Sequence, residues 1–266
     1  QDIEAVNAQF LSVVPVVLIG VAIWFVISYF FNTQMIQTAT HSRPLERREN
    51  MRVYNLTENL CMSVGMPMPK LYIIESDALN AFASGINQKT FAVTLTRGII
   101  NTLNDDELEG VIAHELTHIR NRDVRLLIIT IVFVGIFATI ANIAFRTMLN
   151  SQLYSSRNRR NEKGGGGAVV LVVLLVAGVV YFFSILFKLA LSRSREYMAD
   201  AGAVEMTHKS LALANALKKI SGHSTIEGVD NDEVKELFID YKAEGFFAMF
   251  ATHPPIRKRI QVLEQF

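Results

Sequence analysis

Residues 104–123, NDDELEGVIAHELTHIRNRD, carry the most informative pattern of this chain. Asn104 is followed three positions later by a glutamate, a capping-box start, and apolar residues then recur at helical spacing, which predicts one helix. His114 and His118 are one turn apart and share a face of it. Two imidazoles at this spacing can bind one small cation, and the intervening Glu115 is placed to take a proton from a metal-bound water. The stretch therefore predicts a zinc hydrolase; a pair of buried, neutral, hydrogen-bonded histidines is the alternative.

The third metal ligand has to come from outside this stretch. The extended metalloprotease motif places glycine and histidine at the seventh and tenth positions after the first histidine. This chain has Asn121 and Val124 at those positions. A ligand from a distant part of the sequence must therefore complete the site.

The composition is that of a membrane protein. Half of the 266 residues are hydrophobic, the net charge is +1 and the mean hydropathy is +0.27, which is too apolar for an ordinary cytosolic enzyme. The excess lies in residues 10–31, 126–145 and 168–187, each about 20 residues without a charge, enough to cross a bilayer as a helix. We expect segment 10–31 to be an anchor. A cleaved signal peptide is the alternative, although no basic region precedes the segment and no small-residue cleavage site follows it.

Charge and cysteine content exclude some partners and some chemistry. A net charge near zero leaves no nucleic-acid footprint. Because Cys61 is the only cysteine, no internal disulfide can form, which is compatible with a reducing compartment.

Basic residues predict the topology. Four arginines follow the first hydrophobic segment: Arg43, Arg47, Arg48 and Arg52. By the positive-inside rule they place the predicted metal helix in the cytoplasm. The loop 146–167 is also basic, and if both later segments span it lies on the opposite side, against that rule. Either the loop is tolerated there, or the two segments form a hairpin that does not fully cross. A ligand beyond residue 187 requires an even number of crossings, which two segments satisfy.

The remaining periodicities predict a mixed set of short elements. Strand 90–96 alternates apolar and small or polar residues, as a half-buried strand does; at a sheet edge it would hold an extended peptide, and an ordinary sheet strand is the alternative. The other predictions are a strand at 70–75, a small-residue turn region at 78–85, and helices at 44–66, 188–206, 209–220, 232–241 and 255–266.

The predicted helix 188–206 carries the candidate third ligand. Glu196 and Asp200 are four residues apart and share a face, so the first can bind a metal while the second accepts a hydrogen bond from a ligand histidine. The alternative is an exposed acidic face paired with Arg193 and Arg195, worth little in stability.

Together these motifs resemble the HtpX family of membrane zinc endopeptidases, which belongs to the same larger group as the CaaX prenyl proteases. The resemblance spans residues 32–266 and rests on four stretches: HELTH at 114–118, SREYMAD at 194–200, LNAFA at 79–83, and THPP at 252–255 followed by Arg259 and Ile260. It implies an α+β fold, a mainly helical zincin-type metalloprotease domain with a small β-sheet, plus transmembrane helices.

The resemblance also implies a domain organisation. Residues 1–31 would be the membrane anchor and 32–125 the first part of the catalytic domain. Residues 126–187 would be a hydrophobic helical hairpin with a basic, glycine-rich loop, and 188–266 the second part of the catalytic domain. The chain departs from the family in having one hydrophobic segment before the zinc helix, where relatives commonly have two.

Carried over residue by residue, the resemblance implies one Zn²⁺ per chain, held by His114, His118 and Glu196. Glu115 would be the general base. The remaining implied roles are a second-shell role for Asp200, oxyanion stabilisation by His253, and binding of the substrate backbone by Asn80 and Ala81. From the sequence alone, His253 is a loop or cap residue and Asn80 a turn residue.

The function implied is endopeptidase action on misfolded or damaged membrane proteins, by a multi-pass protein of the cell inner (plasma) membrane with its catalytic domain facing the cytoplasm. Its partners would be protein or peptide substrates and the lipid bilayer. One alternative is a dedicated processing protease of the CaaX type. Another is a membrane chaperone or scaffold with a structural metal, against which Glu115 argues because a closed structural site has no need of a base.

Overall fold

The computed structural model describes residues 33–123, 194–227 and 254–266, with eleven single residues: 19, 23, 26, 27, 31, 125, 178, 181, 229, 238 and 239. Contacts divide the chain into two compact units, residues 1–30 with 129–187 and residues 31–128 with 188–266. The three hydrophobic segments fall almost entirely outside the described residues. Among the helices formed by the described residues, none has both the length and the apolar character needed to cross a bilayer.

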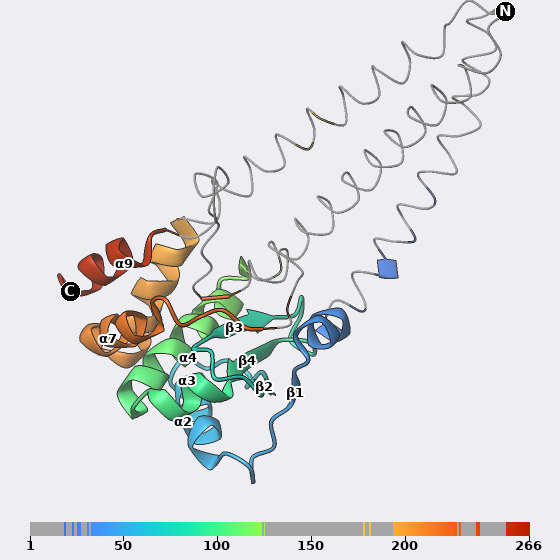
Figure 1. The fold of residues 1–266 in the computed structure, drawn as a ribbon, viewed down its shortest axis with the longest axis horizontal. Coiled ribbons are helices and arrows are strands. Elements are labelled where there is room, and N and C mark those ends of the chain that lie inside the picture. Colours follow the sequence, from blue (N-terminus) through green and yellow to red (C-terminus); the bar gives the residue numbers. More distant parts are fainter. Residues whose placement is uncertain are drawn as a thin grey trace, which may run out of the picture. The chain divides into compact units, whose positions relative to one another are not determined.

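A small mixed sheet forms one part of the second unit (Figure 1). Its strands are β1 (Arg43–Pro44), β2 (Lys70–Ile74), β3 (Ala81–Ser84) and β4 (Ala92–Thr96), in the order β1-β2-β4-β3. β2 and β4 run parallel, with Lys70 opposite Ala92, while β1 and β3 run antiparallel to their neighbours. β3 therefore lies at the edge of the sheet.

The sheet corrects two predictions. The predicted strand 70–75 is confirmed as β2, and strand 90–96 as β4. However, all five residues of β4 are buried, so the expectation of a half-buried strand is wrong. The strand lies between β2 and β3, so of the two alternatives the ordinary sheet strand is the one found. Strand β3, which forms one edge of the sheet, falls inside the predicted turn region 78–85. The prediction of a turn there is therefore also wrong. The small residues of β3 have a low propensity for strands, and the segment forms a strand because it pairs with β4.

Helices pack against the sheet and against one another. Their bounds are α2 (Met51–Ser63), α3 (Arg97–Thr102), α4 (Asp105–Arg120), α7 (Ser210–Ile220) and α9 (Ile256–Leu263), and residues 194–207 are also helical. The predicted capping box of α4 is confirmed. The Asn104 Oδ1 atom accepts from the Glu107 N–H at 2.9 Å, and the Glu107 carboxylate accepts from the Asn104 N–H at 2.9 Å.

Two of the helix predictions differ from the structure, and one helix was not predicted. Predicted helix 44–66 begins only at Met51, where the Asn50 side chain caps it, because Arg43 and Pro44 pair with β2 instead. Helix α3 was not predicted. Of the predicted helix 232–241 only Phe238 and Ile239 are described, and neither is helical.

Helix α4 is the centre of the packing in this unit. It contacts β3 and β4 on one side and α7 and α2 elsewhere, and Figure 1 shows it between the sheet and α7. Leu108, Ile112 and Leu116 on α4 are fully buried, as expected for the hydrophobic stripe of a core-facing helix. The same burial fixes the direction in which the histidines of this helix point.

Candidate active site

The two histidines of α4 face one another. The ring centroids of His114 and His118 are 4.7 Å apart with the rings perpendicular, and their Nε2 atoms are separated by 3.2 Å. The His114 side chain is 1% exposed and that of His118 is 14% exposed. One face of the helix thus presents two imidazole nitrogens to a single point, as the sequence predicts.

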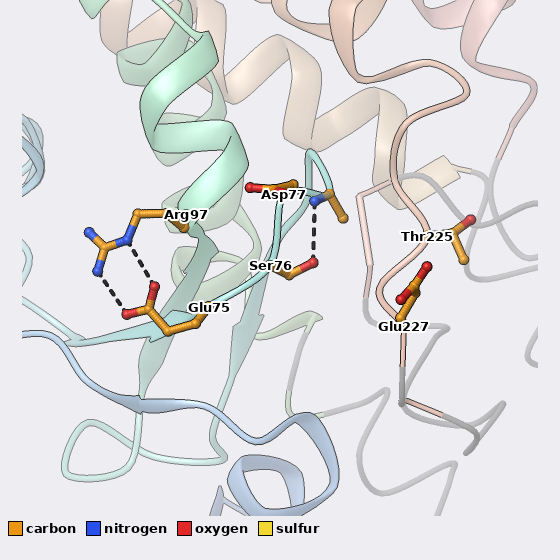
Figure 2. Close-up of a pocket in the computed structure, with 7 residues that line it drawn as sticks. Glu75, Ser76, Asp77, Arg97, Thr225 and Glu227 are labelled. Atoms are coloured by element: carbon orange, nitrogen blue, oxygen red, sulfur yellow. Dashed lines mark hydrogen bonds and ion pairs between the residues drawn. The ribbon is translucent and has the colours of Figure 1, made fainter.

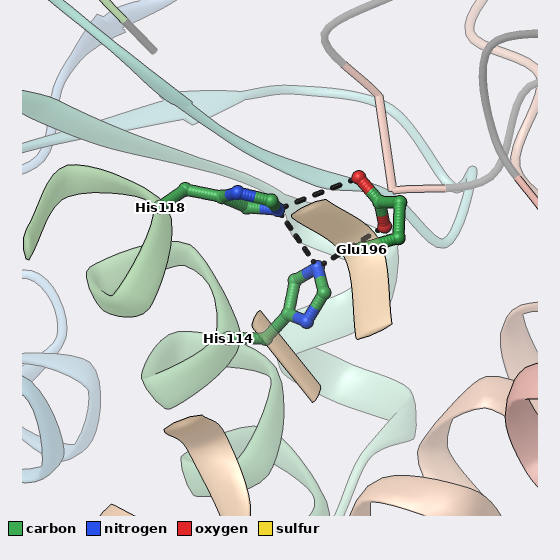
Figure 3. Close-up of side chains that lie close together, drawn as sticks. All are labelled: His114, His118 and Glu196. Carbon is green, nitrogen blue, oxygen red and sulfur yellow. Dashed lines mark hydrogen bonds and ion pairs between the residues drawn. The ribbon is translucent and has the colours of Figure 1, made fainter. Parts of the chain in front are cut away.

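Glu196 reaches the same point from the helix at residues 194–207 (Figure 3). Its Oε2 atom lies 3.5 Å from the His114 Nε2 atom, and its Oε1 atom lies 3.5 Å from the His118 Nε2 atom. Figure 3 shows the three side chains pointing toward one another. The structure therefore brings together the three residues predicted to bind the metal.

These donor atoms fit a zinc ion. A tetrahedral ion with bonds of about 2.0–2.1 Å holds its ligand atoms about 3.3–3.4 Å apart. The separations here are 3.2 Å between the two nitrogens and 3.5 Å from each nitrogen to the carboxylate. Two imidazoles and one carboxylate are also the donor set of catalytic zinc sites, which leave a fourth position open.

A carboxylate contacts the Nδ1 atom of each histidine, behind the ring as seen from Nε2. The Asp200 Oδ1 atom lies 3.0 Å from the His114 Nδ1 atom, where the sequence predicts it. The Asp123 Oδ2 atom lies 3.2 Å from the His118 Nδ1 atom, a contact that sequence reasoning missed. Arg122 adopts a left-handed φ of 61°, which turns the chain just beyond α4. In each pair the Nδ1–H donates to the carboxylate, so Nε2 is the atom left for the metal.

Arg259 of α9 carries part of the sequence resemblance, but its contacts in the site were not predicted. Its side chain is 1% exposed, and its guanidinium donates to both Asp200 oxygens, from Nε at 2.8 Å and from Nη2 at 2.7 Å. Its Nη1 atom lies 3.0 Å from the Glu196 Oε2 atom. Burial alone would raise the pKa of the Asp200 carboxyl, but Arg259 outweighs it and holds that pKa below its usual value. Asp200 therefore stays ionised beside His114.

Glu115 is buried next to the ligands, on the side of strand β3. The residue is 3% exposed, and burial raises the pKa of its carboxyl above the usual value, although the charges of His114 and His118 act in the opposite direction. A hydrogen bond to the backbone of Ala83 also lowers the pKa of Glu115, but by less than burial raises it. A carboxyl with a raised pKa is better suited to take and return a proton near neutral pH.

The predicted substrate residues lie at the edge strand. Asn80 is fully buried; its Nδ2 donates to the Ser224 carbonyl at 2.7 Å, and its Oδ1 accepts from the Ala81 N–H at 2.9 Å. The Ala81 carbonyl accepts from the Ile239 N–H at 3.1 Å. Both residues therefore bind other parts of this chain in the structure, and their substrate role stays a prediction. His253 lies outside the described residues.

One open cavity of about 540 Å³ lies elsewhere in this unit (Figure 2). At its rim the Arg97 guanidinium pairs with the Glu75 carboxylate at 2.7 Å. The lining residues are Glu75, Ser76, Asp77, Ala78, Arg97, Thr225 and Glu227. None of the predicted site residues is among them.

Known proteins resemble the chain along most of its length. The "Protease HtpX homolog" of Bacteroides fragilis is 56% identical over 98% of this chain and 82% of its own length. Proteins of the same description from Listeria innocua and Lactobacillus acidophilus are 39% and 33% identical, over 91% and 94% of this chain and 83% and 85% of their own lengths. The predicted resemblance is thereby confirmed.

A solved structure shares the fold. The crystal structure of S. mikatae Ste24p matches with a TM-score of 0.54 and 17% identity, covering 94% of this chain and 57% of that chain. At this identity the likeness bears on the fold, which is mixed, with helices around a small sheet as predicted.

The model of peptidase family M48 matches residues 47–266. The matched region contains all of the metal group and Glu115. The predicted peptidase activity and the predicted zinc cofactor are confirmed by this match together with the convergence of His114, His118 and Glu196. The chain belongs to peptidase family M48.

Proposed function

We propose that this peptidase is a membrane-bound zinc endopeptidase that hydrolyses peptide bonds of misfolded or damaged membrane proteins. One observation carries the proposal: the ligand atoms of His114, His118 and Glu196 lie within 4.8 Å of one another, beside the buried carboxyl of Glu115. The three long apolar segments of the sequence support the attachment to a bilayer.

His114, His118 and Glu196 would hold the ion, and two imidazoles with one carboxylate are the donor set of catalytic zinc sites. When bound, zinc supplies Lewis acidity toward water and toward the scissile carbonyl. Glu115 takes a proton from the attacking water and returns it to the leaving amine, a role typically worth about 10² to 10⁴ in rate. The reaction proceeds without a covalent enzyme intermediate, because the nucleophile is water.

The carboxylates behind the histidines orient the ligands. Asp200 and Asp123 fix the Nδ1–H tautomers of His114 and His118 and so direct the Nε2 atoms toward the ion. Arg259 holds Asp200 by two parallel hydrogen bonds, the geometry that gives guanidinium–carboxylate pairs their directional strength.

The remaining assignments come from the sequence resemblance. His253 would donate to the developing oxyanion, worth roughly 3 kcal/mol if it acts as other oxyanion donors do. Asn80 and Ala81 would hold the substrate backbone, which the place of Ala81 at the start of the edge strand β3, directly after Asn80, supports.

The proposed setting is the cell inner (plasma) membrane, with several crossings and the catalytic unit facing the cytoplasm. The arginines after the first apolar segment support this orientation. The anchor would be residues 1–31 and the hairpin 126–187, between the two catalytic parts, 32–125 and 188–266. A dedicated processing protease of the CaaX type uses the same site, and a survey of cleaved peptides separates the two functions.

The test is cleavage of an unfolded model protein by the full chain purified in detergent, comparing the native sequence with Glu115→Gln at equal, measured zinc content. We expect the variant to keep its zinc and lose turnover, since Glu115 is not a ligand. His114→Ala should lose both zinc and turnover. The matched control is Glu205→Gln, which makes the same change at an exposed glutamate paired with Arg120 and should behave as the native chain.

Equal cleavage by the native chain and Glu115→Gln would contradict the proposed roles. A chain that binds zinc and cleaves nothing, but prevents aggregation of the unfolded protein, would instead support the chaperone or scaffold.

A further inference from the structure

The edge of β3 that does not pair with β4 forms a hydrogen bond with another part of the chain. The Thr96 N–H donates to the Asn80 carbonyl at 3.0 Å, so the backbone groups of Asn80 face β4. In an antiparallel ladder the next residue faces the other way, and the backbone groups of Ala81 therefore point away from β4. There the Ile239 N–H donates to the Ala81 carbonyl at 3.1 Å and lies 3.2 Å from the Asn80 Oδ1 atom.

A buried aromatic side chain anchors this contact. Phe238 is 3% exposed, and its ring centroid lies 5.5 Å from that of Phe82 in β3. It belongs to a hydrophobic cluster that also contains Ile74, Ile226 and Val229. Ile239 is thus held beside Ala81 by the packing of its neighbour as well as by its own hydrogen bond.

The carbonyl of Ile239 is bound by Arg259, which also contacts Glu196. The Arg259 Nη1 atom donates to it at 3.3 Å, and the same atom lies 3.0 Å from the Glu196 Oε2 atom. Both backbone polar groups of Ile239 are therefore engaged, the N–H by the edge strand and the carbonyl by the arginine that also binds Asp200. The contact connects the edge strand to the carboxylates behind the metal site.

The proposed binding of the substrate backbone uses the same edge. Glu115 hydrogen-bonds to the backbone of Ala83, two residues along β3 from Ala81, so this edge passes the general base. An extended peptide bound to the edge, with its scissile bond near Glu115, makes main-chain hydrogen bonds to alternate residues of β3. The Ala81 carbonyl is one of the hydrogen-bond acceptors that the peptide requires, and the Ile239 N–H already donates to it.

We propose that Phe238 and Ile239 form an internal competitor for the substrate strand. Peptides bind along β3 when Ile239 leaves the Ala81 carbonyl, and its departure also removes one partner of Arg259. The observed affinity for a peptide is then the intrinsic affinity reduced by the fraction of molecules in which Ile239 is displaced. This inference deepens the proposed function and rests on it.

Peptide affinity in the full-length Glu115→Gln chain, loaded with zinc, tests the proposal. The probe is a fluorescein-labelled β-casein peptide that the native chain cleaves, followed by fluorescence anisotropy. Adding Ile239→Pro removes the competing N–H, and adding Phe238→Ala removes the aromatic anchor. We expect each to lower the peptide Kd by about 3- to 10-fold, the range set by the net value of one hydrogen bond. The control is Leu211→Ala, which truncates an exposed apolar residue of α7 outside this cluster and should leave the Kd unchanged.

The same substitutions in the active enzyme, with Glu115 restored, should lower KM and leave kcat unchanged. Amide exchange in the Glu115→Gln chain, without either substitution at 238 or 239, gives a second measurement. The Ile239 amide should lose protection when the peptide saturates the chain.

An unchanged or higher Kd in both variants, or an Ile239 amide that stays protected at saturating peptide, would overturn the competitor. These results leave the peptidase itself intact, because the probe is chosen by native cleavage. If the native chain cleaves no β-casein peptide at all, the proposed function fails first.

Discussion

Gly202 lies against Thr117 so closely that no side chain fits between the two helices. A Cβ atom on Gly202 would lie 2.9 Å from the Thr117 Oγ1 atom and closer still to its Cγ2 atom. Thr117 lies between the two histidines of α4, and Gly202 follows Glu196 and Asp200 on the opposing helix. This close approach sets the distance across which the carboxylates reach the imidazoles.

We therefore expect Gly202→Ala to push the two helices apart. Overpacking of this kind typically costs about 1–3 kcal/mol of stability. The zinc affinity should fall with it, because the ligand atoms no longer converge. Thermal unfolding and zinc competition with a chelator measure the two effects.

A second substitution should repair the first. Thr117→Ala removes the Oγ1 and Cγ2 atoms and leaves 3.3 Å between the new side chain and the Thr117 Cβ atom. The double variant should therefore bind zinc more tightly than Gly202→Ala alone, and non-additivity in this double-mutant cycle reports the contact. Strict additivity would show that Gly202 acts in some other way.

Arg259 should be essential to stability because of its buried partners. Arg259→Met leaves Asp200 and Glu196 without the buried cation that compensates their charge, and breaking such a pair typically costs about 3–5 kcal/mol. Arg259→Lys keeps the charge but cannot make two parallel hydrogen bonds, so its loss should be smaller. Urea unfolding of the zinc-free chain measures both variants.

Arg257→Met is the control for this comparison, since Arg257 lies on the same helix and is exposed. It should change the free energy of unfolding by no more than a typical surface substitution, about 0.5 kcal/mol. A native-like Arg259→Met would show that the buried ion pair is dispensable.

The carboxylates behind the histidines should affect zinc affinity more than chemistry. Asp200→Ala removes the acceptor of the His114 Nδ1–H and should weaken zinc binding about 10- to 100-fold, as such losses generally do. Turnover at saturating zinc should persist. Asp200→Asn, which can keep an acceptor oxygen, separates loss of the hydrogen bond from loss of charge. Full zinc affinity and full activity in Asp200→Ala would contradict the role.

Sequence reasoning succeeded where local pattern determines structure. The helical period and the capping box locate α4, and a spacing of four places Glu196 and Asp200 on one face of their helix. It failed where contacts between distant segments decide. Residues 78–85 are mostly small, which favoured a turn, and Ala81–Ser84 within them form an edge strand because β4 pairs with them.

Two contacts of the site, those of Arg259 and Asp123, were not predicted from the sequence. Arg259 lies on a short helix with three other charged or polar neighbours, where an arginine is normally exposed, and only the tertiary structure shows that it faces Asp200. Asp123 is five residues after His118, just beyond the helix, and it turns back because of the left-handed residue before it. Helical periodicity alone does not predict either contact.

Zinc binding should release protons, and the charges around His118 set the pH range. Burial lowers the pKa of His118, but its hydrogen bonds to Asp123 and Glu196 outweigh this and raise the pKa to about 10 in the metal-free chain. Below pH 10 the imidazole is therefore protonated, and an ion that binds Nε2 must displace that proton. The apparent zinc affinity should rise as pH increases from 6 to 9, about tenfold per unit for each proton released.

Calorimetry of zinc binding in buffers of different ionisation enthalpy counts those protons. In Asp123→Asn the anion that stabilises protonated His118 is gone, so the pKa of His118 falls, fewer protons are released at pH 8, and the affinity depends less steeply on pH. Asp105→Asn, at the exposed start of α4, should match the native chain. Identical heats in all buffers would mean that His118 is already neutral before the ion binds. Asp123 would then orient the ring through the Nδ1–H without keeping a second proton on Nε2.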